Sequence, residues 1–319
     1  MSDHPLAPSA SAIAALYPLF ERAQEYAGRA RAARTLDAYD KQWRAFCGWC
    51  ELSGLRPLPA SPETLALYLT ARAQDGRAVA TLVQGVSAIV QAHKLAGHRS
   101  PSTPAVREVL RGIQRVHGRP QKQKKPLLGA DVQAMLQRQP DSTIGLRNRA
   151  LLLVGFLGGF RRAELVAICV EHVTITPEGL LVQLFGNKDD KHFRGRKVPI
   201  ARGSDPALCP VLALEAWLSA SGLHAGPVFR SVSRHGQVGR PLAGRDVAVI
   251  LKRLARDAGL DARNIAAHSL RAGFVTAAHQ RGATIPAIMK VTGHRSYDTA
   301  LKYIREADLF AELPSRNLF

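Results

Sequence analysis

The chain has 319 residues, 46% of them apolar, which is ample for two domains of ordinary globular composition. No apolar run reaches the roughly 18 residues that span a membrane, and no signal-peptide pattern is visible, so we expect a cytoplasmic protein. Lysine and arginine number 44 against 25 acidic residues, a net charge of +19, which indicates a nucleic-acid partner without separating DNA from RNA or from a simply basic enzyme.

The first third of the chain has the pattern of a small helical domain. Residues 1–10 are small and include proline, which predicts a flexible N-terminus. Apolar residues three and four positions apart predict helices throughout 11–117. Ser61 before Pro62 predicts a helix start, and two further helices are expected near 80–96 and 104–117.

Two of the four cysteines, Cys47 and Cys50, form a CxxC pair within this helical pattern. No second CxxC or histidine pair follows at a useful distance, so zinc is not expected and the pair is interpreted as part of the core. The sequence predicts no disulfide framework, no bound metal and no cofactor.

A basic segment follows at residues 118–126, with two prolines and clustered lysines. Proline and like charge both disfavour a packed element, so we interpret it as an interdomain linker. From Arg99 to Lys125 there are eight lysines and arginines against one acidic residue. Solubility does not require so many positive charges in one segment, whereas crossing a phosphate backbone does. The charge therefore favours a linker that contacts nucleic acid.

The remaining residues, 127–319, predict a mixed domain. Strands are expected at 172–176, 179–185 and 196–200, with a polar loop between the last two. Helices are expected near 130–137, 146–156, 162–168, 208–220, 243–258, 268–280, 284–291 and 297–306. The predicted fold class is mostly α with a small β-sheet, as an all-helical N-terminal domain and an α+β C-terminal domain.

The segment GFRRAEL places Arg161 three residues before Glu164. On a helix the two side chains would share a face, and an arginine held by a carboxylate can present its planar fork to a phosphate. The alternative is a surface ion pair, but the pair follows an apolar run at 151–160, where burial is expected.

Two other segments hold candidate phosphate or proton chemistry. Lys188 and Lys191 lie in the polar loop, where a lysine could reach a leaving group or could simply be exposed. His268 and Arg271 are three residues apart and could converge on one phosphate, or could form an ordinary polar helix start.

The segment VTGHRSYDTALKYIR predicts a turn between two helices. Gly293 is expected to end one helix and Ser296 to cap the next. His294 then lies in the turn, and Tyr303 lies two turns into the following helix. For a tyrosine with apolar neighbours on a helix, the alternative interpretation is core packing.

Taken together, these segments resemble the tyrosine recombinase, or phage integrase, family. The family's G-L-R-x-x-E-L box matches 159–165, its hairpin lysine box matches 187–190, its H-x-x-R box matches 268–271, and its G-H-x-S-x-x-T…Y box matches 293–303. The helical first domain and the linker also resemble the family's core-binding domain, so the resemblance covers nearly the whole chain. It favours Arg161 over Arg162, Lys188 over Lys191 and Tyr303 over Tyr297.

The resemblance implies site-specific DNA recombination by a transesterification that needs no metal and no ATP. A 3′-phosphotyrosyl intermediate conserves the energy of the broken bond. In the expected catalytic set, Tyr303 is the nucleophile, and Arg161, Arg271 and His294 hold the phosphate with Glu164 in support. His268 is the expected proton acceptor and Lys188 the expected proton donor.

The resemblance also implies that the two domains form a C-shaped clamp on double-stranded DNA. The expected DNA contacts are basic residues: Arg31, Arg34, Lys41, Arg77, Lys94, Lys122, Lys124, Lys125 and, for reading base edges, Arg245. The alternative is that these residues form a solvated basic face without contacting DNA. A homotetramer on DNA is implied, and we expect the tail ADLFAELPSRNLF to dock on a neighbouring subunit. An accessory DNA-bending factor is a possible partner.

Two rival functions share most of these features. A type IB topoisomerase-like relaxase would use the same chemistry without pairing two DNA sites. A catalytically inactive architectural DNA-binding protein would need only the basic surface. The sequence leaves open the target site, the choice among integration, excision and resolution, the mobile element that carries the gene, and cleavage in cis or in trans.

Overall fold

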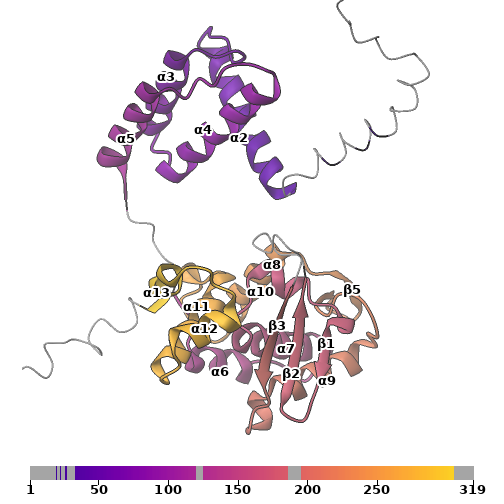
Figure 1. Cartoon of the computed structure of the whole chain (residues 1–319). Helices are drawn as coiled ribbons and strands as arrows, with labels where there is room; N and C mark the ends of the chain where they lie inside the picture. Colours follow the sequence, from indigo (N-terminus) through magenta and orange to yellow (C-terminus); the bar gives the residue numbers. More distant parts are fainter. Residues whose placement is uncertain are drawn as a thin grey trace, which may run out of the picture. The chain divides into compact units, whose positions relative to one another are not determined.

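The computed structural model describes residues 33–119, 125–185 and 195–304, together with Leu19, Arg22 and Tyr26. It divides into two compact units, residues 1–121 and 122–319 (Figure 1). Among the described residues, no helix combines the length and the apolar character that crossing a membrane requires.

The described part of the first unit is all-helical, as predicted. Its helices are α2 (Ala33–Leu52), α3 (Pro62–Gln74), α4 (Val79–Leu95) and α5 (Pro104–His117). Ser61 caps α3, because its side chain accepts a hydrogen bond from the Thr64 backbone N–H. The start of α5 follows the same pattern, with a threonine cap before a first-turn proline.

Aromatic side chains form the centre of this first core. Phe46 and Tyr68 meet edge to face with ring centroids 5.0 Å apart, and Trp49 packs on the same tyrosine. Cys50 is fully buried among them, where burial raises the pKa of its thiol to about 11. This position agrees with the interpretation of Cys50 as a core residue.

The second unit combines helices with two small antiparallel sheets, and the predicted fold class is confirmed. One sheet has the order β1-β2-β3 and the other pairs β4 with β5. The elements are α6 (Gly129–Gln137), α7 (Thr143–Leu157), α8 (Arg162–Val166), η1 (Val170–His172), β1 (Val173–Ile175), β2 (Gly179–Leu184), β3 (Arg196–Ala201), η2 (Pro206–Leu208), α9 (Pro210–Ser221), β4 (Arg230–Val232), β5 (Val238–Pro241), α10 (Gly244–Asp257), η3 (Ala262–Asn264), α11 (His268–Gln280), α12 (Ile285–Thr292) and α13 (Tyr297–Ile304).

Helix α7 is the central element of the second unit. It is buried along most of its length, packs against α9 and α11, and belongs to one continuous apolar core. After α7 the chain reverses at Gly159, whose φ of +54° lies in the left-handed region that favours glycine. The segment 159–165, which matches the family's G-L-R-x-x-E-L box, therefore begins directly after this buried helix.

The structure differs from the sequence prediction in two respects. The expected helix at 162–168 ends at Val166, and the strands β4 and β5 were not predicted. Both strands are short and partly exposed, and β5 contains Gly239 and Pro241, so neither shows the alternation that marks a longer strand. Lys125, placed in the predicted linker, donates a backbone hydrogen bond to the Asn264 carbonyl of the second unit at 2.9 Å.

Candidate active site

The geometry around Arg161 corrects one prediction. Arg161 is not inside a helix but is the N-cap of α8, with extended backbone (φ −66°, ψ 149°), so the shared helical face was a wrong interpretation. Glu164 instead accepts two hydrogen bonds from Arg161, one from its backbone N–H and one from Nη1, both at 2.8 Å. The buried carboxylate therefore caps α8 and orients the guanidinium, as the supporting role expected for Glu164 requires.

A second arginine, Arg196, binds the same carboxylate and was missed in the sequence. It opens strand β3, and its Nη2 lies 2.9 Å from Glu164 Oε2. Burial, ahead of any neighbouring charge, lowers the pKa of its guanidinium. In the sequence, the one indication of a role for Arg196 is that it follows the polar loop that holds Lys188. Nothing in the sequence distinguishes it from the neighbouring Arg194 and Lys197.

Among the expected catalytic residues that the structure describes, Arg271 is the most deeply buried, with 1% of its surface exposed. Its Nη1 donates to the Gly159 carbonyl at 2.8 Å and to the Thr292 carbonyl at 2.7 Å. Its Nη2 is also buried and has no hydrogen-bond partner among the described residues. Burial first, and then the charge of Arg161, lower the pKa of Arg271 to about 10.

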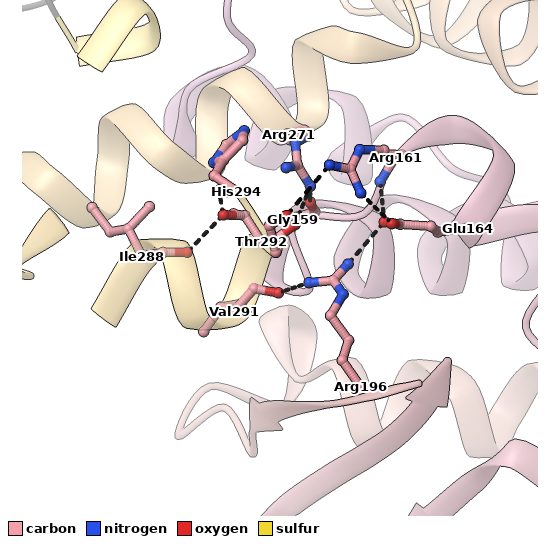
Figure 2. Close-up of polar contacts among 10 residues, drawn as sticks. Gly159, Arg161, Glu164, Arg196, Arg271, Ile288, Val291, Thr292 and His294 are labelled. Atoms are coloured by element: carbon pink, nitrogen blue, oxygen red, sulfur yellow. Dashed lines mark hydrogen bonds and ion pairs between the residues drawn. The ribbon is translucent and has the colours of Figure 1, made fainter. Parts of the chain in front are cut away.

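Three consecutive carbonyl oxygens at the C-terminal end of α12, those of residues 291–293, each accept a hydrogen bond from a different arginine (Figure 2). The donors are Arg196, Arg271 and Arg161, in that order. Terminal helix carbonyls lack partners within the helix and attract cations. Gly293 ends the helix as predicted, in the left-handed conformation with φ +69°. The arginines therefore fix the turn that carries the next residue, a histidine.

The rings of His294, in this turn, and Tyr303, on α13, lie side by side. Their ring centroids are 5.5 Å apart with planes tilted by 31°. Burial first, and then the charges of the three arginines, lower the pKa of His294 to about 3, so its ring is neutral at neutral pH. Tyr303 also packs against the buried Val275 and Ile288, so the core-packing alternative describes part of its environment.

His268 is the first residue of α11, with its side chain exposed. Desolvation by surrounding protein atoms first, and then the charge of Arg271, lower its pKa. The second unit thus gathers Arg161, Glu164 and Arg271 with the two histidines and the tyrosine. Lys188, the remaining member of the expected catalytic set, lies outside the described residues.

The expected DNA contacts are partly described. Lys41 and Arg77 are both exposed in the first unit and line one hollow of about 220 Å³ together with Arg72. Lys94 is exposed near the end of α4 but does not line that hollow, and Lys125 and Arg245 are exposed in the second unit. The rest lie outside the described residues or have undescribed side chains: Arg31, Arg34, Lys122, Lys124 and the C-terminal tail.

One further group in the second unit has the ligand types of a metal site. Potential ligand atoms of Cys169, Glu171 and His172 lie within 4.8 Å of one another. Glu171, however, already accepts a hydrogen bond from the Gly226 backbone N–H at 2.9 Å, and the His172 ring packs against Phe185 with centroids 5.0 Å apart. Two of the three groups therefore have other partners.

Comparison with known proteins identifies the family. Residues 125–309 match the model of the Phage integrase family. An integrase/recombinase xerD homolog from Selenomonas ruminantium is 35% identical over 290 residues, covering 89% of this chain and 85% of the relative. The chain belongs to the phage integrase family of tyrosine recombinases. The resemblance predicted from the motifs is confirmed, and the activity of this enzyme is site-specific DNA recombination.

Other relatives and solved structures agree. Tyrosine recombinase XerD from Xanthomonas axonopodis pv. citri is 28% identical over 284 residues, covering 85% of this chain and 87% of the relative. The fold is similar to that of a lambda integrase(75-356) dimer bound to a COC′ core site, with TM-score 0.60, 18% identity and 92% and 95% of the two chains covered. It is also similar to the Tn1549 transposon integrase in complex with transposon right end DNA, with TM-score 0.62, 12% identity and 88% and 92% covered.

Proposed function

We propose that this recombinase cuts and rejoins double-stranded DNA through a 3′-phosphotyrosyl link to Tyr303, with the arginine cluster holding the scissile phosphate. The observation that carries the proposal is the charge at the site. Three partly or fully buried guanidiniums lie together, Glu164 is the carboxylate that binds two of them among the described residues, and the buried Nη2 of Arg271 has no partner there. Buried like charges are unfavourable unless an anion compensates them, and a phosphodiester supplies both that charge and acceptor oxygens.

The proposed chemistry exchanges one phosphodiester for another. The Tyr303 oxygen forms a bond to phosphorus while the bond to the 5′-oxygen breaks. Because a tyrosine hydroxyl has a solution pKa near 10, it needs a proton acceptor, the role proposed for His268. Arg161 and Arg271 stabilise charge on the non-bridging oxygens, with a hydrogen bond from His294. Lys188 would protonate the departing oxygen.

We also propose that residues 11–117 and 127–319 act as the two arms of a clamp on DNA, joined by the linker at 118–126. The exposed positions of Lys41, Arg77, Lys94, Lys125 and Arg245 support contact with phosphates or, for Arg245, with base edges. Neutralising Arg77 together with Lys41 should reduce the steepness of the salt dependence of DNA binding by roughly one per lost phosphate contact.

Assembly on DNA belongs to the same proposal. A solved lambda integrase tetramer bound to a Holliday junction has a similar fold, with TM-score 0.59, which supports a homotetramer that pairs two DNA sites. We propose that the C-terminal tail docks on a neighbouring subunit and that an accessory DNA-bending factor assists. The relatives come from bacteria, which supports a role at the nucleoid in the bacterial cytoplasm, in integration, excision or resolution of a mobile element. Deleting the C-terminal tail tests the docking, because a chain without the tail should no longer assemble as tetramers on DNA.

A nicked suicide substrate tests the cleavage chemistry. Fragmented, nicked genomic DNA from the source organism is incubated with the recombinase, and denaturing gels reveal protein that carries covalent DNA. Sequencing the trapped fragments identifies the site. The wild type should form an adduct and Tyr303→Phe should form none. Adducts with both proteins, or with neither, contradict the proposal. Recombination between two cloned copies of the site then separates a recombinase from a relaxase, and absence of any adduct would point to an architectural protein.

A further inference from the structure

The hydroxyl of Thr292 joins helix α12 to the active-site histidine. Thr292 is fully buried, and its Oγ1 lies 2.7 Å from the Ile288 carbonyl oxygen and 2.9 Å from His294 Nδ1 (Figure 2). Both distances are typical of well-formed hydrogen bonds. One hydroxyl therefore takes part in two hydrogen bonds, one to the backbone and one to the ring.

Counting protons assigns the direction of each bond. A carbonyl oxygen can only accept, so the single hydroxyl proton of Thr292 lies on the bond to Ile288. Toward the ring, Oγ1 then has only lone pairs to offer, and His294 Nδ1 must be the donor. A neutral imidazole carries one proton. With that proton on Nδ1, the other nitrogen, Nε2, presents a lone pair.

The surroundings of the ring make this assignment consequential. Nε2 points away from Thr292 in Figure 2. Among the described residues, the charges that act on the His294 ring are those of Arg271 from α11, Arg161 at the start of α8 and Arg196 from β3, and the Tyr303 ring from α13 lies against it. Glu164 binds Arg161 and Arg196. Burial first, and then the arginine charges, keep the ring neutral, so the tautomer decides whether Nε2 can donate or accept a hydrogen bond.

We propose that Thr292 is a positioning residue that holds His294 in the Nδ1–H tautomer, so that His294 bonds to the substrate phosphate only after Nε2 gains a proton. A phosphate oxygen is an acceptor and repels an Nε2 lone pair. The negative charge of the phosphodiester, placed among the arginines, favours the imidazolium instead. Binding of DNA thereby takes up one proton from solvent at His294. The assignment of the tautomer does not depend on the proposed function, whereas the proton uptake rests on it.

Nuclear magnetic resonance of the DNA-free protein tests the tautomer directly. The full chain is labelled with ¹⁵N-histidine, and correlations between ring nitrogens and ring carbon-bound protons show which nitrogen is protonated. His294→Gln identifies the His294 signals. Wild type and Thr292→Ser should show a protonated Nδ1 and a bare Nε2. Thr292→Val, which keeps the shape without the hydroxyl, should show a substantial fraction protonated at Nε2. A wild-type ring protonated at Nε2, or a Val variant with an unchanged tautomer, overturns the proposal.

The pH dependence of DNA binding tests the consequence. Binding is measured with a trapped genomic site in a Tyr303→Phe background, where no covalent bond forms. Affinity should weaken with rising pH, with a slope approaching tenfold per pH unit for one proton. Thr292→Ser should keep the slope and Thr292→Val should flatten it, because a neutral Nε2–H ring can donate without proton uptake. Equal slopes in the Ser and Val variants contradict proton uptake at His294, while a covalent adduct with Tyr303→Phe contradicts the proposed function alone.

Discussion

Two buried arginines of the second unit, Arg147 and Arg271, share almost every bulk property. They are 3% and 1% exposed, and burial is the main reason that the pKa of each falls to about 10. Arg147 donates to the Asn148 side chain at 2.9 Å and to the Arg230 carbonyl at 3.2 Å. Arg271 keeps one buried nitrogen without a described partner and lies near a histidine and a tyrosine. Burial and a lowered pKa therefore do not distinguish the arginine proposed to bind the phosphate from Arg147, whereas the unused donor beside groups that can transfer protons does.

Replacing either arginine with lysine keeps the charge but loses the planar fork, and the two variants should lose different properties. Arg271→Lys should slow formation of the covalent DNA adduct by about 10²–10³-fold, as for loss of one oxyanion donor. Arg147→Lys should instead lower the free energy of unfolding by about 1–3 kcal/mol and leave the rate per folded molecule nearly unchanged. Single-turnover cleavage and urea unfolding of both variants measure this, and equal rate losses would show that the unused donor does not distinguish Arg271 from Arg147.

Removing the carboxylate among the arginines should mainly affect stability. Glu164 is 7% exposed and binds both Arg161 and Arg196. Glu164→Gln should lower the free energy of unfolding by about 3 kcal/mol, because it leaves buried guanidiniums uncompensated. The matched control is Glu108→Gln, whose exposed pair with Arg111 should contribute at most about 0.5 kcal/mol. Similar losses in the two variants, read by urea unfolding, would show that the cluster tolerates its positive charge alone.

The neutral ring of His294 predicts a pH effect on stability. Its pKa falls from 6.5 to about 3 in the folded chain, so between these values the unfolded chain binds a proton that the folded chain does not. This contribution is complete above the unfolded pKa and is lost as pH falls toward the folded pKa. Between about pH 7 and about pH 5 the wild type should lose about 1–2 kcal/mol more stability than His294→Gln. Parallel unfolding curves at the two pH values would contradict a neutral buried ring.

The smallest effect separates backbone strain from crowding at the site. Gly222 and Gly293 both end helices in the left-handed conformation, with φ of +63° and +69°. A Cβ on Gly222 would meet no atom within 4 Å, whereas one on Gly293 would lie 3.0 Å from the Arg196 guanidinium. Gly222→Ala should cost about 1 kcal/mol from backbone conformation alone. Gly293→Ala should cost somewhat more and should also slow adduct formation. An unchanged cleavage rate would show that the α12 turn is not a critical support.

The sequence predicted what local pattern controls. Helix positions, the three-stranded sheet and the family motifs all follow from periodicity, turn residues and short spacings. The supporting contacts did not, because they join distant segments: Arg196 reaches Glu164 across 32 positions and Arg271 reaches Gly159 across 112. The backbone state of Arg161 was also unpredictable, since spacing cannot tell an N-cap from a helix interior.

Locating the covalent bond in the DNA adduct shows whether Tyr303 is the nucleophile. The trapped wild-type adduct is digested with protease and nuclease, and mass spectrometry identifies the peptide that retains a nucleotide. We expect a single modified residue, Tyr303, in the helix that begins at Tyr297. A nucleotide on Tyr297 or on any other residue would contradict it.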